Sequence, residues 1–244
     1  MKTLNKKLGG TKYLLFLDLE GTQYTHEVIS IGAYLAKLTR AGTTGPTKKG
    51  FYILVKSREK ISKFITEFTG ITNSMVEKDG VSFDEAMIRL RKYIGGSLKH
   101  TRMVTYGASD LGMLRSSINN APYNEKSDEF VETLCKTNLD FQAFSTQYMK
   151  DDKNNVLSLQ NSIKKFSLEF EGNQHNALAD AKNLQNLYDS FQSKYDIVIN
   201  EYKKVLQQNK KLPRAVARVL KSLQDGQTVT PDFYNELIED EVRD

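Results

Sequence analysis

The 244-residue sequence is poor in cysteine and has no long apolar run. Its single cysteine, Cys135, cannot form an internal disulfide and lies in an apolar stretch without metal-ligand spacing, which favours a reducing compartment. No segment is apolar for long enough to span a membrane, and Asp18 interrupts the first apolar run before it reaches the length of a signal-peptide core. We therefore expect a cytoplasmic protein that does not associate with membranes.

A strong charge of one sign is also missing. The sequence has 35 Lys and Arg against 30 Asp and Glu, a net charge of +5, which is a mild bias toward polyanions shared by many unrelated proteins. The length and the 39% hydrophobic content fit a globular protein with one sizeable core. Net charge alone selects no partner.

Two carboxylates stand out in the stretch LLFLDLEGT, where an apolar run meets Asp18 and Glu20. Residues two apart on a strand point to the same face, so these side chains would lie next to each other and repel. Such a pair persists if one carboxyl is protonated, if both face water, or if a cation holds them. Taken alone, a D-x-E pattern is more often a solvated turn than a metal site.

Strand patterns dominate the first quarter of the chain. Apolar and aromatic runs predict strands over 13–18, 27–38 and 51–56, joined by a turn over 21–26 and a hairpin loop over 40–50. Short strands over 103–106 and 138–141 follow, each ahead of a helix. A meander followed by strand–helix units predicts an α/β fold of the ribonuclease H type, with a mixed five-stranded sheet flanked by helices.

Helical patterns are clearest in the middle and later segments. Ser82 and Glu85 form a capping-box pattern ahead of a helix that Gly95 ends. Further helices are predicted over 110–118, 158–166 and 176–191. The last of these has one apolar face, made of Ala177, Leu178, Ala181, Leu184, Leu187, Tyr188 and Phe191.

The composition changes after Ser193. We therefore divide the chain into a domain over 1–192 and a helical C-terminal extension over 193–244, with a break at Pro213. The extension is basic and then acidic, through Lys203, Lys204, Lys210, Lys211, Arg214, Arg218 and Lys221, and then Glu236, Glu239, Asp240 and Glu241. A solvated helical face and a nucleic-acid track are equally consistent with the basic part.

Chain direction brings more acidic residues toward the first carboxylate pair. Asp110 follows the strand at 103–106, and ligands of such sheets gather outside the carboxyl ends of neighbouring strands. The helix that carries Asp180 is expected to pack against this edge. His175 is expected in the loop ahead of an Asn176 cap, because five helical residues subtend about 140° and His175 and Asp180 could not otherwise share a face.

Some of these residues have simpler interpretations. Asp110 could cap the helix that it opens, and Asp140 could take its place if the strand register differs. His175 alone would more often be a surface or capping histidine, the interpretation that we give to His26 and His100.

Several carboxylates around one hollow would repel one another unless they bind metal. Two Mg²⁺ or Mn²⁺ ions roughly 3.5 to 4 Å apart would neutralise them and clamp a phosphodiester, one ion activating water and the other stabilising the leaving oxygen. A nearby histidine, with its usual pKa of about 6.5, is neutral often enough near neutral pH to take the proton of that water.

Three segments resemble the motifs of the DEDDh branch of DnaQ-like 3′-to-5′ exonucleases, in the ribonuclease H-like superfamily. They are Asp18-Leu19-Glu20-Gly21-Thr22, Tyr106-Gly107-Ala108-Ser109-Asp110, and His175-Asn176-Ala177-Leu178-Ala179-Asp180-Ala181. The segment TGITNSMV at 69–76 is also similar to a connector of this family, and the resemblance spans about 13–191. Each motif is weak alone, but their order is specific.

The resemblance implies removal of nucleoside monophosphates from 3′ ends by two divalent metal ions. It assigns Asp18 to both ions, and Glu20 and Asp180 to the ion that carries the attacking water. Asp110 would support the second ion, and His175 would be the general base.

The resemblance also implies contacts with the substrate. The backbone around Gly21 and Thr22 would lie near the 3′-terminal hydroxyl, and Ile71 near the terminal bases. Tyr106-Gly107 stands where some RNA-trimming members have Trp-Gly, which favours RNA slightly over DNA. Some relatives are dimers, which allows a dimer without requiring one.

Three functions follow as hypotheses. The first is a metal-dependent 3′-to-5′ exonuclease that acts on single-stranded RNA or DNA 3′ ends and releases nucleoside 5′-monophosphates. The second is a nucleic-acid-binding or protein-interaction module that keeps the fold without turnover. The third is an endonuclease or recombinase on the same fold, which would cleave closed circles.

Overall fold

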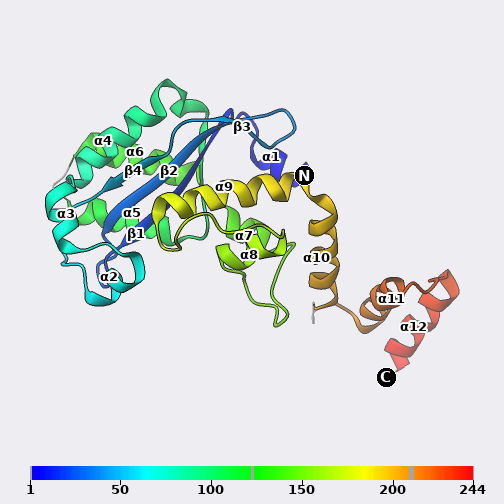
Figure 1. The fold of residues 1–244 in the computed structure, drawn as a ribbon. Coiled ribbons are helices and arrows are strands. Elements are labelled where there is room, and N and C mark those ends of the chain that lie inside the picture. The colour runs from blue at the N-terminus through cyan, green and yellow to red at the C-terminus, as the bar shows by residue number, and fades with distance from the viewer. Residues whose placement is uncertain (1, 122–123, 209–211, 244) are drawn as a thin grey trace.

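A mixed β-sheet forms the centre of the molecule in the computed structural model, which describes residues 2–121, 124–208 and 212–243 (Figure 1). The strands are β1 (Tyr13–Gly21), β2 (Val28–Leu38), β3 (Thr44–Thr47), β4 (Phe51–Leu54), β5 (Thr101–Thr105) and β6 (Leu139–Asp140). Their order is β3-β2-β1-β5-β6, and β4 also pairs with β2. β1 is antiparallel to β2 and parallel to β5, which is parallel to β6.

The sheet has the five strand positions that the sequence predicts, with one edge position divided between β3 and β4. β4 pairs with residues 30–33 of β2, and β3 pairs with Ala36 and Leu38. The predicted loop over 40–50 is therefore wrong at Thr44–Thr47. This short strand has the sequence TGPT, which lacks the apolar alternation that marks a strand.

β1 extends beyond the end that the sequence predicts. It continues to Gly21, since Leu19 and Glu20 pair with Ile31 and Ser30 of β2. Asp18 and Glu20 therefore lie within the strand, where neighbouring strands fix the direction of their side chains.

Helices cover both faces of the sheet (Figure 1). They are α1 (Lys2–Lys7), α2 (Lys63–Thr69), α3 (Asn73–Asp79), α4 (Phe83–Ile94), α5 (Ser109–Asn120), α6 (Glu125–Lys136), α7 (Phe141–Ser145), α8 (Leu159–Lys165), α9 (Ala177–Ser193), α10 (Tyr195–Gln207), α11 (Arg214–Gln224) and α12 (Pro231–Arg243), with a 3₁₀ helix at Gly95–His100. In the described parts of the chain, none of them combines the length and the apolar character needed to cross a bilayer.

β1 packs on both of its faces. Its leucines at 15, 17 and 19 point into a core with α4, α5 and α6, whereas Leu14 and Phe16 point into a core with α1, α7, α8 and α9. Because successive side chains alternate between the two faces, Asp18 and Glu20 follow Leu14 and Phe16 onto the α9 side.

Several predicted helix ends are confirmed. The side chains of Ser82, Ser158 and Asn176 each accept a hydrogen bond from a backbone N–H in the first turn of their helix, and Gly95 ends α4 with a φ of 70°. The predicted apolar face of α9 is buried, apart from the half-buried Leu178. The sequence patterns did not predict α1, α2, α3 or α6.

The C-terminal extension starts on the body of the protein and ends away from it (Figure 1). α10 packs Val198 into the α9-side core, and Glu201 lies 2.8 Å from Lys165 of α8. Beyond Pro213, α11 and α12 pack against each other as a helical hairpin.

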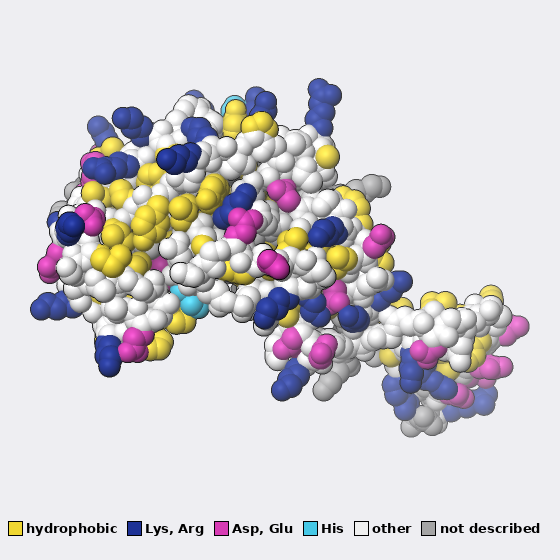
Figure 2. Space-filling view, viewed as in Figure 1, with side chains coloured by type: hydrophobic (Ala, Val, Ile, Leu, Met, Phe, Trp, Pro, Cys, Tyr) yellow, Lys and Arg dark blue, Asp and Glu magenta, His cyan; other side chains and the backbone are white. Residues whose placement is uncertain are grey.

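Charges of the extension pair partly with one another. Glu241 of α12 accepts a hydrogen bond of 2.7 Å from the N–H of Ala215, and Arg218 lies 3.7 Å from Asp240. Figure 2 shows both signs of charge next to each other on this hairpin. Part of the basic run is thus neutralised internally, while Lys210 and Lys211 lie outside the described residues.

Candidate active site

The first two acidic residues of the site lie on one face of the central strand. Asp18 is half-buried and Glu20 is 8% exposed. Directly opposite Asp18 on β2 is Gly32, whose missing side chain has a structural reason. A Cβ atom at Gly32 would lie 2.1 Å from the carbonyl carbon of Ala177, the first residue of α9. The glycine therefore lets the start of α9 approach the sheet above Asp18.

The close approach of α9 to the sheet places Asp180 and His175 near Glu20. Asn176 caps α9, and His175 precedes it in a left-handed turn with a φ of 59°, as the sequence predicts for a histidine in the loop ahead of the cap. Asp180 lies in the first turn and is 9% exposed. One potential ligand atom each from Glu20, His175 and Asp180 lies within 4.8 Å of the other two.

The fourth carboxylate, Asp110, comes from the start of α5 and is 3% exposed. Its Oδ1 accepts a hydrogen bond of 3.0 Å from the N–H of Leu19, the residue between Asp18 and Glu20. This bond fixes Asp110 to β1 across 91 residues of sequence. Ala108, which occupies the cap position of α5, makes no side-chain capping bond.

Asp140, the alternative to Asp110, has a different environment. Its Oδ1 accepts hydrogen bonds from the N–H of Ala143, at 2.9 Å, and from the N–H of Gly107, at 3.2 Å. It therefore caps α7 and holds the turn that leads from β5 to Asp110.

Burial and mutual repulsion set the electrostatics of these carboxyls. Burial first, and then the charges of Asp110, Asp180 and Glu20, hold the pKa of Asp18 well above its usual value. Burial and the neighbouring carboxylates raise the pKa of Glu20 to about 8. Burial and nearby acids also raise the pKa of Asp110 to about 7, although the bond from Leu19 opposes the shift.

Burial also shifts the pKa values of the two residues at the start of α9, His175 and Asp180. Burial raises the pKa of Asp180 to about 6 and lowers that of His175. Each shift disfavours the charged form, which is the effect of burial on an ionisable group. Carboxylate oxygens are hard donors that suit Mg²⁺ or Mn²⁺, and the ligand atoms that converge in the structure belong to Glu20, His175 and Asp180.

An aromatic pair next to the site was missed by the sequence reasoning. The ring centroid of Phe68 in α2 lies 3.6 Å from that of His175, and Phe64 stacks on Phe68 at 5.9 Å. The side chains of Phe64 and Phe68 are 59% and 47% exposed. Their spacing of four residues is a helical signal that could have placed them on one face of α2.

The three predicted substrate contacts lie in different settings. Gly21 ends β1, and the hydroxyl of Thr22, which is 2% exposed, accepts a hydrogen bond of 2.9 Å from the N–H of Glu27. Ile71 is 3% exposed and belongs to a small core. The other members of that core are Ile29, Leu54, Ile61, Ile65 and Val76. The substrate contacts of Gly21, Thr22 and Ile71 stay predictions.

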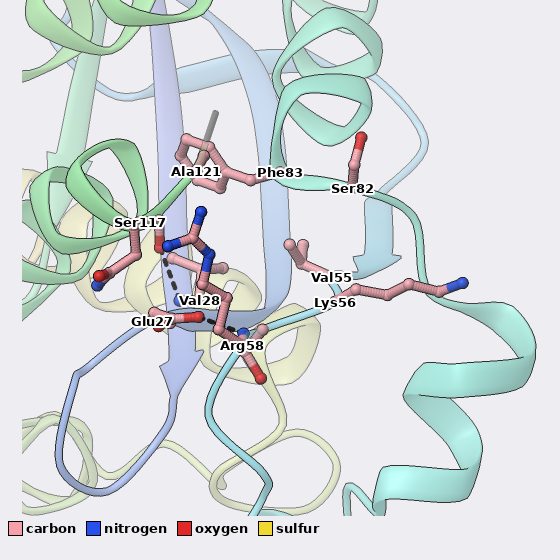
Figure 3. Close-up of a pocket in the computed structure, with 11 residues that line it drawn as sticks. Glu27, Val28, Val55, Lys56, Arg58, Ser82, Phe83, Ser117 and Ala121 are labelled. Carbon is pink, nitrogen blue, oxygen red and sulfur yellow. Dashed lines mark hydrogen bonds between the residues drawn. The ribbon is translucent and has the colours of Figure 1, made fainter. Parts of the chain in front are cut away.

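A second hydrogen-bond network supports the turn between β1 and β2 (Figure 3). Glu27 accepts a bond of 2.6 Å from the N–H of Arg58, and the N–H of Val28 donates to Ser117 of α5 at 2.8 Å. These residues line a pocket of about 260 Å³ that contains none of the five acidic and histidine residues of the site. The bond from Val28 to Ser117 holds the start of β2 against α5.

The sheet order and the acidic hollow place this protein in the exonuclease class of ribonuclease H-like α/β folds. The family model described as RNase_T, exonuclease, matches residues 15–188. The chain therefore belongs to the RNase_T exonuclease family. No curated protein sequence matches it.

Three solved structures illustrate the similarity of fold. A full-length 3′-exonuclease matches with a TM-score of 0.58 and 16% identity, over 75% of this chain and 62% of that one. The nuclease domain of 3′hExo, a DEDDh family member bound to rAMP, matches with a TM-score of 0.57 and 17% identity, over 75% of this chain and 92% of that one. Cell-death related nuclease 4 (CRN-4) matches with a TM-score of 0.58 and 15% identity, over 77% of this chain and 65% of that one. The chain thus covers less than two thirds of the full-length 3′-exonuclease.

Proposed function

We propose that this protein is a metal-dependent 3′-to-5′ exonuclease that removes nucleoside 5′-monophosphates from single-stranded 3′ ends. The proposal rests on one observation, the convergence of Glu20, His175 and Asp180 within 4.8 Å next to Asp18 and Asp110. The family to which the chain belongs supports the reaction class.

Asp18, Glu20, Asp110 and Asp180 would hold two divalent ions, Mg²⁺ or Mn²⁺. When bound, such ions activate water for attack on phosphorus and stabilise the negative charge of the leaving oxygen. The protein contributes the position of each oxygen, through the strand pairing of β1, the bond from Leu19 to Asp110 and the close contact of α9 at Gly32.

His175 would act as the general base. Because burial lowers its pKa, the imidazole is neutral at physiological pH and has a free nitrogen lone pair for the proton of the attacking water. Its turn projects it from the sheet next to Asp180, and the ring of Phe68 limits its movement on one side.

The exposed rings of Phe64 and Phe68 would stack on bases near the 3′ end. Every base has an aromatic face, so such stacking holds a single strand without selecting its sequence. Gly21 and Thr22 lie at the end of β1 and would face the terminal hydroxyl, and Ile71 would shape the pocket floor behind the bases.

RNA is slightly favoured over DNA as the substrate. By their descriptions, one similar structure is bound to rAMP, a ribonucleotide, and another concerns 3′-end recognition of the histone mRNA stem-loop. The hydroxyl of Tyr106, the residue that favours RNA in the sequence, donates to the carbonyl of Leu157 at 3.0 Å.

The test follows 5′-labelled single-stranded RNA and DNA of one sequence, with Mg²⁺, with Mn²⁺ and with a chelator. The natural protein is compared with Asp18→Asn, His175→Ala and the control Asp152→Asn, which changes an exposed loop carboxylate. We expect a metal-dependent ladder that shortens from the 3′ end, is lost in the first two variants and persists in the control.

Two outcomes would contradict the proposal. Binding of RNA without shortening by the natural protein would make it a recognition module. Cleavage of a covalently closed circle would make it an endonuclease, because an exonuclease needs a free end.

A further inference from the structure

A second pocket lies at the other end of the central strand, near α1. Its volume is about 260 Å³, and it is lined by Gly9, Gly10, Thr11, Lys99, His100, Thr101, Arg102 and Thr137. The N–H of Lys12 donates to the carbonyl of His100 at 2.8 Å, which holds the segment before β1 against the 3₁₀ helix. In Figure 1, α1 and α2 mark the two opposite ends of β1.

The lining of this pocket has one sign of charge. It includes Lys99, His100 and Arg102, and none of its lining residues is acidic. The hydroxyls of Thr101 and Thr137 already donate to backbone carbonyls, at 2.9 and 3.0 Å. The donors left for a ligand are therefore mainly those of the three basic side chains.

Arg102 has a buried donor without a partner. Its Nε is inaccessible to solvent and makes no hydrogen bond within the described residues. An unsatisfied buried donor of a charged group costs more free energy than a neutral one. Because Nε itself has no accessible surface, a ligand in the pocket can reach the half-buried Arg102 only through the other atoms of its guanidinium.

We propose that this pocket binds a phosphate group. A tetrahedral oxyanion offers several acceptor oxygens to the Arg102 fork and to the ammonium of Lys99, and charge-assisted bonds of this kind are among the strongest that proteins make. The phosphate has two sources that the structure fits equally, a free phosphate or nucleotide and the backbone of a nucleic acid.

The distance between the two ends of β1 gives a way to distinguish a free phosphate from a nucleic-acid backbone as the ligand. From Thr11 to Asp18 the chain advances seven residues, or about 23 Å at 3.3 Å per residue of strand. At 3.4 Å per step this corresponds to roughly seven steps of a stacked nucleic-acid strand. A nucleic acid that reaches both ends must exceed this length, whereas a free phosphate has no length requirement.

The first experiment measures binding of inorganic phosphate and of pyrophosphate to the full chain by calorimetry, in chelator. The variants are Arg102→Gln and the double variant Lys99→Gln with His100→Gln, whose side chains are exposed and whose loss should not affect folding. Arg89→Gln, an exposed arginine of α4, is the control for loss of one charge. For a free-phosphate site we expect affinity to fall roughly tenfold in the first two variants only.

The second experiment measures binding of labelled RNA of 5 and 24 nucleotides by anisotropy, also in chelator, where no turnover occurs. For a site that binds the nucleic-acid backbone, Arg102→Gln should weaken binding of the 24-nucleotide RNA roughly tenfold and reduce the salt dependence of that binding by about one phosphate contact. Binding of the 5-nucleotide RNA should stay unchanged. Circular dichroism checks that each variant folds.

The proposal is wrong if neither probe loses affinity in Arg102→Gln or in the double variant, or if Arg89→Gln has the same effect. Failure of the exonuclease proposal would be a separate result. It would appear as the absence of 3′-shortened products in the activity test, whereas the binding measurements here need no turnover.

Discussion

The two ends of β1 have opposite chemistry. At the α9 end, Asp18 and Glu20 join two further carboxylates whose pKa values burial and repulsion raise. At the α1 end, Lys99, His100 and Arg102 surround a pocket without an acidic lining residue. The acidic end would attract cations and the basic end an anion, although a single strand joins them. A metal-bound reaction centre and a phosphate site can therefore be tested independently in one protein.

The largest expected effect is the loss of turnover when a carboxylate at the acidic end of β1 is replaced. Asp18→Asn removes one charge and one carboxylate oxygen while keeping the shape of the side chain. We expect turnover of single-stranded RNA to fall by about a thousandfold or more, because Asp18 would be one of the carboxylates that hold the divalent ions. Single-turnover kinetics with saturating Mg²⁺ measures this, and Arg102→Gln at the basic end should leave turnover of a 5-nucleotide RNA unchanged. An Asp18→Asn enzyme with normal turnover would remove Asp18 from the reaction.

The next effect displaces the start of α9. A Cβ at Gly32 would lie 2.1 Å from the backbone of Ala177, so Gly32→Ala must shift α9 and with it His175 and Asp180. We expect turnover to fall roughly a hundredfold from misplacement, with a loss of about 1–3 kcal/mol in the free energy of unfolding. Urea titration and steady-state kinetics measure the two losses.

The matched control is Gly112→Ala in α5, where an added Cβ has open space. It should stabilise the fold by about 0.5–1 kcal/mol and leave turnover unchanged. Equal effects of the two alanines would show that the close approach of α9 does not position the site.

A smaller effect concerns the aromatic pair. Phe68→Ala removes a stacking surface next to His175. We expect KM for single-stranded RNA to rise about tenfold, in line with roughly 1–3 kcal/mol per stacked base. An unchanged KM with a lower kcat would instead indicate that Phe68 serves to hold the imidazole.

The smallest expected effect is on stability without metal. The pKa of Glu20 is about 8 in the folded protein and near 4.5 when unfolded, so the folded state binds more protons between these values. The stability from this group is complete below about pH 4.5 and is lost as the pH rises through about 8. In chelator, Tm should therefore fall between pH 5 and 8, and Asp18→Asn should raise Tm at pH 8 by about 3–6 °C. Added Mg²⁺ should stabilise the natural protein more at pH 8 than at pH 5.

The sequence predicts the acidic end far better than the basic end. Asp18, Glu20, Asp110, His175 and Asp180 lie in short motifs, and chain direction in a mixed sheet suffices to bring them near one another. The basic pocket has no motif, since it forms where the turn at Gly9–Gly10 meets the 3₁₀ helix. From the sequence alone, His100 therefore has the interpretation of a surface or capping histidine.

Local sequence also fails where tertiary contacts decide. The strand β3 forms from TGPT because β2 offers it a partner, and the close contact at Gly32 depends on a helix that begins far along the chain. Phe64 and Phe68 have helical spacing, but only the fold places them next to His175.

The contact between Gly32 and Ala177 also bears on the order of events during folding. It joins residues 145 positions apart, and the bond from Leu19 to Asp110 joins residues 91 positions apart. Closing such long loops is entropically costly and slow compared with forming local helices. The reactive hollow therefore completes only after α9 has docked, so a partly synthesised or partly folded chain lacks it, and any nuclease activity reports that the whole of the sheet and its last core helix are in place.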